Sequence, residues 1–199
     1  MINYNGELLS SESNISNTNR AFLFGDGVFE TLKIVNNKIL FLEDHYFRLM
    51  ASMRILRMEI PMDFTMEFFE EQLLSTLKNE GCLDSARVRI TVYRNDGGYY
   101  LPLTNTISYL IHATPLQSQV YVLESKSCEV DLYKDFYISK QLLSTLKTTN
   151  KVLHVTASIY ANENDFNAYI KSIATKEQIK WTSKGLHALY MTTRGDLRS

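Results

Sequence analysis

The sequence predicts a mixed α/β fold of the α+β kind, divided into two domains. Segments with strict apolar–polar alternation, typical of half-buried strands, are interspersed with segments whose apolar residues recur at helical spacing. A short segment that contains Pro115, residues 115–119, follows the last clear strand and is expected to be a linker. We therefore expect a small N-terminal domain over residues 1–114 and a larger domain that starts at residue 120.

Alternation defines the expected strands. It predicts strands over residues 28–35, 87–94 and 106–113. The segment 38–42 is expected to pair back with the first of these, and shorter strands are expected after residue 120. Near the N-terminus, Asn5-Gly6 interrupts an alternating segment and predicts a tight hairpin turn.

Helical spacing defines the expected helices. The first apolar stripe is formed by Tyr46, Leu49, Met50, Met53 and Leu56. A second helix is expected to begin at Asp63 as N-cap and to end at Gly81. A further helix is expected from about residue 151 to 161.

Composition and charge argue against several classes of protein. The formal net charge of −1 does not suggest a nucleic-acid partner, which normally requires a basic face. The chain opens without a targeting segment, and no apolar run reaches the length of a membrane span, so we expect a cytoplasmic protein without a membrane partner. Cys82 and Cys128 form no CxxC pair, and the four histidines are not spaced as a metal set, so no metal is expected.

Three segments carry the chemical signal of the sequence. They are NRAFLFGDGVFET over residues 19–31, LEDHYFRL over 42–49 and LKTTN over 146–150. In this order and on this strand–strand–helix pattern, they resemble the class IV aminotransferases, a family that includes branched-chain and D-amino-acid aminotransferases and aminodeoxychorismate lyase. The resemblance covers roughly residues 1–170 and implies a two-domain fold that binds pyridoxal 5'-phosphate.

The resemblance also implies roles for particular residues. Lys147 matches the lysine that forms the Schiff base with pyridoxal phosphate, a role that suits a partly desolvated amine. Arg48 matches the phosphate anchor, since a guanidinium can donate to two oxygens at once. Phe29, Thr31 and Arg89 match substrate-contacting positions. The plainer alternatives are a surface lysine, a solvated helix arginine, a core phenylalanine and an arginine on a water-facing sheet.

The resemblance leaves the reaction open. The implied activity is transfer of an amino group between an amino acid, with the branched-chain type favoured, and a 2-oxo acid, in a homodimer. The lysine segment reads K-x-x-N, as in the lyase and D-amino-acid branches, and lacks the tyrosine usual in branched-chain enzymes. The segment after Arg94 lacks the second arginine of the lyase's glycine-rich turn. The alternatives are therefore aminodeoxychorismate lyase and a catalytically inactive remnant.

The last part of the chain departs from the family pattern. Residues 120–170 match the start of the larger cofactor-binding domain, whereas residues 171–199 are expected to be a divergent tail. The net charge changes from −5 over residues 1–170 to +4 over residues 171–199. The family's glutamate for the pyridine nitrogen has no match there. We therefore expect an incomplete C-terminal domain and little or no transaminase activity from these 199 residues.

Overall fold

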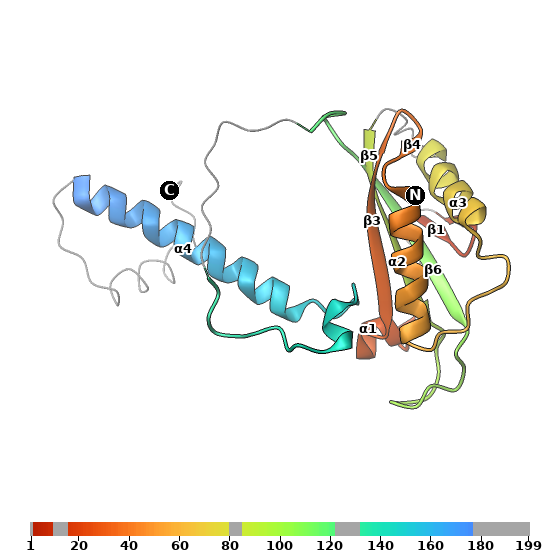
Figure 1. Ribbon diagram of the computed structural model, residues 1–199. Coiled ribbons are helices and arrows are strands. Elements are labelled where there is room, and N and C mark those ends of the chain that lie inside the picture. The colour runs from red at the N-terminus through yellow and green to blue at the C-terminus, as the bar shows by residue number, and fades with distance from the viewer. Residues whose placement is uncertain (1, 10–15, 80–84, 122–131, 177–199) are drawn as a thin grey trace. The chain divides into compact units, whose positions relative to one another are not determined.

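The computed structural model describes residues 2–9, 16–79, 85–121 and 132–176, and the chain divides into two compact units (Figure 1). One unit comprises Met1–Ser125 and Lys140–Asn150, and the other comprises Lys126–Ser139 and Lys151–Ser199. This division differs from the expected ranges, because Lys140–Asn150 joins the first unit rather than the second. Pro115, expected in the linker, is the last residue of a strand.

The first unit is built on one antiparallel sheet of six strands (Figure 1). In spatial order these are β2 (Glu7–Leu9), β1 (Ile2–Tyr4), β6 (Ile107–Pro115), β5 (Ser85–Arg94), β3 (Gly27–Val35) and β4 (Lys38–Ile39). The three main predicted strands and the Asn5-Gly6 hairpin are confirmed. The return strand is shorter than expected, because Phe41 adopts a left-handed φ of 56° and caps a helix that starts at Leu42.

Two helices, α2 (Leu42–Ile55) and α3 (Met66–Asn79), pack on the sheet and enclose the core. The first helix contacts β3, and the second contacts β6, β5 and β1 (Figure 1). Side chains along a strand point alternately to the two faces of the sheet, so every second one points towards these helices. Core members from the sheet and helices include Val28, Leu32, Ile34, Leu49, Met53, Phe69, Leu73, Leu77, Val88, Ile90 and Ile111.

The predicted start of one helix is wrong because a different residue caps it. The second predicted helix begins at Met66 rather than near Asp63. The hydroxyl of Thr65 accepts a hydrogen bond from the amide of Phe68 at 3.2 Å, so Thr65 acts as the N-cap. Asp63 is also of a residue type that caps helices, but it lies in a turn before the cap.

Two further segments differ from expectation. A short helix, α1 (Arg20–Phe24), capped by Asn19 and ended by Gly25 in the left-handed conformation, was not predicted. Residues 132–151 contain no strand, only the 3₁₀ helix η1 (Leu142–Thr145). The last described helix, α4 (Val152–Lys176), is longer than the segment expected from about 151 to 161.

Some expected features fall outside the described residues. They include Gly81 as the end of α3, both cysteines and residues 177–199 of the tail. Within the described part of the chain, no helix combines the length and the hydropathy that a bilayer span requires. The same residues hold no group of three or more potential metal ligands from His, Cys, Asp and Glu.

Candidate active site

A buried acid, Glu30, lies at the centre of the candidate site. It occupies a helix-facing position of β3, where its neighbours on the same face are apolar, and only 1% of it is exposed. Arg48 binds it side-on: Nε donates to Oε1 at 2.6 Å and Nη2 donates to Oε2 at 2.7 Å. His45 Nδ1 lies 2.8 Å and Lys147 Nζ 3.5 Å from Oε2. The fold thus brings together two predicted site residues, Lys147 and Arg48, around one carboxylate.

These partners decide the ionisation of Glu30. Burial by itself favours the neutral acid, but the hydrogen bonds from Arg48 and His45 and the charges of Lys147 and Arg48 outweigh it, so the pKa of Glu30 is lowered. A carboxylate can only accept hydrogen bonds, so Nδ1 of His45 carries the proton of their contact. The 3.0 Å approach of Arg48 Nη2 to the same nitrogen is then a close contact between two donors.

The segment that carries Lys147 pairs with the start of β3, on the part of its edge that β4 does not cover. The amide of Phe29 donates to the carbonyl oxygen of Lys147 at 2.9 Å, and the amide of Thr149 donates to that of Gly27 at 2.9 Å. Val28 and Thr148 form an isolated antiparallel bridge. These backbone contacts fix the lysine beside β3 although it is remote in sequence.

The two glycines of the GDG motif allow this close approach. A Cβ on Gly25 would lie 3.1 Å from the Cβ of Asn150, and Gly25 also has a left-handed φ of 66°. A Cβ on Gly27 would lie 3.1 Å from the carbonyl oxygen of Val92 and 3.2 Å from a methyl carbon of Thr149. A side chain at Gly25 would be strained by its left-handed backbone and would crowd Asn150, and one at Gly27 would crowd both β5 and the lysine segment.

The predicted substrate residues lie on the opposite face of the sheet from Glu30. Phe29 and Thr31 alternate onto this face of β3, and Thr31 is paired in register with Arg89. The guanidinium carbon of Arg89 lies 3.7 Å from the ring centroid of Phe29, and Lys147 Nζ lies 5.2 Å from the same centroid. Burial, and then the neighbouring charge of Arg87, lowers the pKa of Arg89. Phe29 thus links the lysine to the arginine across the sheet edge.

The acid of the GDG motif has a different environment. Asp26 accepts a hydrogen bond from Nε of Arg20 at 2.8 Å and from Nε of Arg94 at 3.0 Å. The same arginines donate to backbone carbonyl oxygens, including those of Tyr99 at 2.7 Å and Leu56 at 2.7 Å. This cluster ties α1, β5 and the segment after β5 to the start of β3.

Sequence reasoning missed Glu30 and treated His45 as structural. The signal for Glu30 was available, because it is the one acid in an apolar face formed by Val28, Leu32 and Ile34. A buried acid in such a row requires charged or hydrogen-bonding partners. Its partners could not be named from the strand alone, since they come from α2 and from residue 147.

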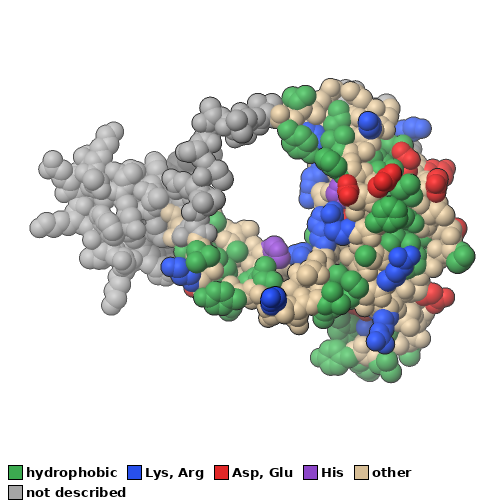
Figure 2. Space-filling view, viewed as in Figure 1, with side chains coloured by type: hydrophobic (Ala, Val, Ile, Leu, Met, Phe, Trp, Pro, Cys, Tyr) green, Lys and Arg blue, Asp and Glu red, His purple; other side chains and the backbone are tan. Residues whose placement is uncertain are grey.

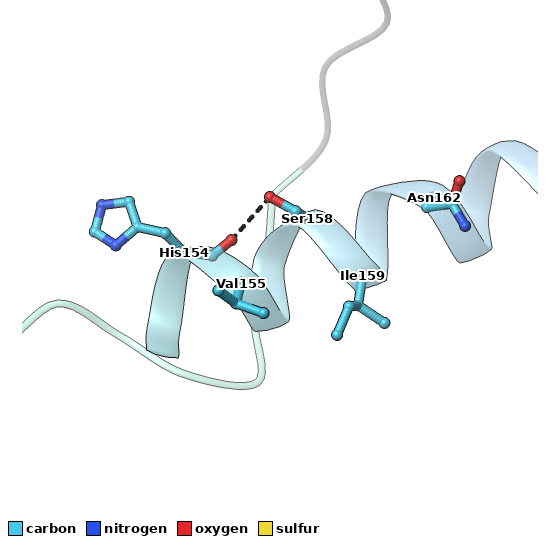
Figure 3. A pocket seen from close by; sticks show the side chains of 5 residues that line it. All are labelled: His154, Val155, Ser158, Ile159 and Asn162. Atoms are coloured by element: carbon cyan, nitrogen blue, oxygen red, sulfur yellow. Dashed lines mark hydrogen bonds between the residues drawn. The ribbon is translucent and has the colours of Figure 1, made fainter. Parts of the chain in front are cut away.

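Basic side chains gather on one side of the first unit (Figure 2). Figure 2 shows lysine and arginine side chains gathered near a histidine on the side of this unit turned away from α3. A different hollow lies on α4, lined by His154, Val155, Ser158, Ile159 and Asn162 (Figure 3). The hydroxyl of Ser158 donates to the carbonyl oxygen of His154 at 2.9 Å, a bond within the helix, and no predicted site residue lines this hollow.

The chain belongs to the class IV aminotransferases: the model of the family "Amino-transferase class IV" matches residues 27–197. Enzymes of this family use pyridoxal 5'-phosphate. The match extends past residue 170, so most of the segment expected to diverge lies inside the matched range.

Relatives by sequence are D-alanine aminotransferases. The chain is 34% identical to that of Bacillus licheniformis over 102 residues, which are 51% of this chain and 31% of that enzyme. It is 39% identical to that of Staphylococcus aureus (strain N315) over 49 residues, which are 24% of this chain and 17% of that enzyme. The matched stretches therefore span well under two thirds of these relatives.

Similar solved structures are branched-chain aminotransferases. The branched-chain amino acid aminotransferase of Escherichia coli superposes with a TM-score of 0.62 at 19% identity, covering 76% of this chain and 52% of that chain. This likeness concerns the fold alone. The T.th. branched-chain amino acid aminotransferase, solved with pyridoxamine 5'-phosphate, has a TM-score of 0.52 at 26% identity, covering 58% of this chain and 40% of that chain.

Proposed function

We propose that the protein carrying this chain is a pyridoxal-phosphate-dependent transaminase, in which Lys147 binds the cofactor aldehyde and Arg48 binds its phosphate. One observation carries the proposal: the amine of Lys147 and the guanidinium of Arg48 contact the same oxygen of Glu30, at 3.5 and 2.7 Å. In pyridoxal phosphate, the aldehyde and the phosphomethyl group lie on neighbouring ring carbons. An amine and a guanidinium held this close together match that arrangement.

The described residues fit the cofactor in charge and in exposure. The side chains of Arg48 and Lys147 are 48% and 34% exposed, so both remain reachable although they bind a buried acid. When bound, pyridoxal phosphate supplies an electron-withdrawing ring that makes the α-proton of an amino acid acidic. Lys147 can hold and move that proton at Nζ once its amine is free of the cofactor.

Substrate binding is proposed on the other face of β3. Arg89 offers a cation for a carboxylate next to the ring of Phe29, and Thr31 lies opposite Arg89 in the register. On the same face, Thr91 and Tyr93 line a hollow of about 550 Å³, which is large enough for a small amino acid. Amino acids and 2-oxo acids both carry the carboxylate that this arginine would recognise.

Two substrate types have specific support. The branched-chain type is favoured by Arg89, which matches a substrate-contacting arginine of that branch, and by the 26% identity to the T.th. branched-chain enzyme. D-Alanine is favoured by the 34% identity to the Bacillus licheniformis enzyme. Turnover of L-leucine and D-alanine with 2-oxoglutarate as acceptor would separate them, and release of pyruvate from aminodeoxychorismate would instead indicate the lyase.

The cofactor role of Lys147 can be tested by chemical trapping. Purified protein incubated with pyridoxal phosphate and then reduced with borohydride should carry a phosphopyridoxyl group on Lys147, located by peptide mass spectrometry. Lys147→Ala should abolish this label, whereas Lys151→Ala, on a neighbouring lysine, should retain it. A label of unchanged yield in Lys147→Ala would refute the assignment.

The proposal includes association of two copies. Large apolar side chains of α1 and of the segment after β5 are exposed, namely Phe22, Leu23, Tyr99, Tyr100, Leu101 and Leu103. Arg20 fixes this surface by donating to the carbonyl oxygens of Gly97 and Tyr99, at 3.0 and 2.7 Å. An exposed apolar patch held in place in this way suits a protein interface. Leu101→Glu should shift the protein towards monomer in sedimentation, and an unchanged mass would contradict this interface.

A further inference from the structure

The proposed function gives no role to Glu30, the acid that the proposed cofactor residues share. We propose that Glu30 is a positioning residue, which orients Arg48 and Lys147 towards the cofactor through direct hydrogen bonds. This inference rests on the proposed function, because it concerns the same site. It goes further in assigning the geometry of that site to a buried acid that itself need not touch the cofactor.

The contact between Glu30 and Arg48 uses one edge of the guanidinium. Nε and one hydrogen of Nη2 are directed to the two carboxylate oxygens, at 2.6 and 2.7 Å. The end-on edge, formed by Nη1 and the second hydrogen of Nη2, still offers two parallel donors. Arg48 is nearly half exposed, so without Glu30 its long side chain could rotate and lose this orientation.

Lys147 is held by the same acid in a looser contact. Its Nζ lies 3.5 Å from Oε2 of Glu30 and 5.2 Å from the ring centroid of Phe29. Both an ammonium and a neutral amine can donate a hydrogen bond to a carboxylate. Glu30 can therefore locate the lysine in either protonation state, which suits a group that must gain and lose a proton.

His45 completes the arrangement by keeping Glu30 an acceptor. Its Nδ1 donates to Oε2 at 2.8 Å. The same oxygen therefore accepts from two residues of α2, His45 and Arg48, and from Lys147. The pKa of Glu30 is lowered in this setting despite burial. Glutamine in its place would have nearly the same shape but one acceptor oxygen, and its amide nitrogen would face donors.

The test is a double-variant cycle on cofactor affinity, measured by titration of pyridoxal phosphate and the change in its absorption. Glu30→Gln and Arg48→Ala should each raise the dissociation constant by about tenfold or more. The two short hydrogen bonds of Glu30 are to Arg48, so most of its effect should pass through Arg48, and the double variant should bind only slightly more weakly than Arg48→Ala alone. Arg54→Ala on the same helix serves as the matched control and should leave the constant unchanged.

The outcomes separate this inference from the proposed function. Absence of borohydride-trapped label on Lys147 in the unaltered protein would overturn the proposed function. If labelling is normal but the two fold-changes in the dissociation constant multiply in the double variant, the inference about Glu30 is overturned and the proposed function stands. Should Glu30→Gln fail to fold by circular dichroism, Glu30→Asp, which keeps the charge but shortens the reach, takes its place in the cycle. A bound-cofactor absorption maximum unchanged in either Glu30 variant, with unchanged affinity, would also overturn the inference.

Discussion

Asp26 and Glu30 lie close together in the chain, yet they organise opposite kinds of charged cluster. Asp26 is bound by Arg20 and Arg94, whose side chains are 3% and 8% exposed. Glu30 is more deeply buried than Asp26, at 1% against 16%, but its partners Arg48 and Lys147 are 48% and 34% exposed. A buried acid thus serves structure in one case and presents cations to solvent in the other.

The donors of the arginines explain this difference. Arg94 donates through Nε to Asp26, through Nη2 to the carbonyl oxygen of Leu56 and through Nη1 to Asn105. Its three nitrogens are therefore all engaged within the protein. Arg48 gives Nε and Nη2 to Glu30 and keeps an edge directed away from that acid. Burial of a carboxylate therefore says less about function than the unused donors of its partners.

The largest expected effect is on stability and comes from the closed cluster. Asp26→Asn leaves two buried guanidinium groups without their counter-charge, so we expect the free energy of unfolding to fall by about 3–5 kcal/mol. Urea denaturation followed by circular dichroism measures this change. Asp63→Asn, an exposed acid that caps no helix, is the control and should change it by less than about 0.5 kcal/mol. An equal loss of unfolding free energy in Asp26→Asn and Asp63→Asn would contradict the structural role of Asp26.

The next effect is on cofactor binding and comes from the open cluster. Arg48→Ala should weaken binding of pyridoxal phosphate by about 1.5–3 kcal/mol, the usual contribution of a hydrogen bond to a charged group. Equilibrium titration gives the dissociation constants. Arg54→Ala, exposed on the same helix, should bind as the unaltered protein does. Similar losses in both variants would mean that Arg48 only supports the helix.

A smaller effect concerns the pH dependence of stability. The pKa of Glu30 is lowered in the folded protein below its ordinary value of 4.5. The contacts that Glu30 makes as a carboxylate therefore stabilise the fold fully above about pH 4.5. This stabilisation is lost as the pH falls through the lower pKa of the folded state. Near neutral pH, Glu30→Gln should lower the free energy of unfolding by about 1–2 kcal/mol. The difference between variant and unaltered protein should shrink below pH 4.5; a difference that grows there would contradict the lowered pKa.

The smallest expected effect is the loss of stability when an uncharged N-cap hydrogen bond is removed. Thr65→Ala removes the hydroxyl that caps α3 and should lower the free energy of unfolding by about 1 kcal/mol. Thermal or urea unfolding measures it against Asp63→Ala, the residue that sequence reasoning had chosen as the cap. A larger loss in Asp63→Ala would restore the original assignment.

Much of the first unit could be predicted because local pattern and tertiary structure agree there. The strand at 28–35 has one largely apolar face, and the apolar stripe from Tyr46 to Met53 packs with that face in the core. The division into units was not foreseen, because it depends on the backbone pairing of Val28 with Thr148, remote in sequence. The two glycines of the GDG motif, Gly25 and Gly27, leave room for that pairing.

The sequence predicted candidate residues for the site but not the acid that two of them share. Resemblance selected Lys147, Arg48, Phe29, Thr31 and Arg89, and the fold brings the first two to Glu30 and the others to the opposite face. Periodicity cannot indicate which side chains from α2 reach an acid on β3. The shared carboxylate therefore emerged only from the three-dimensional arrangement, although an acid within an apolar strand face was the visible sign of it.

The most direct test of this account compares the affinity for pyridoxal phosphate of two matched charge neutralisations, Glu30→Gln and Asp26→Asn, under conditions in which both remain folded. We predict a dissociation constant about tenfold higher for Glu30→Gln and one within about twofold of the unaltered protein for Asp26→Asn. If Asp26→Asn weakens cofactor binding as much as Glu30→Gln does, the distinction between a closed structural cluster and an open cofactor site is wrong.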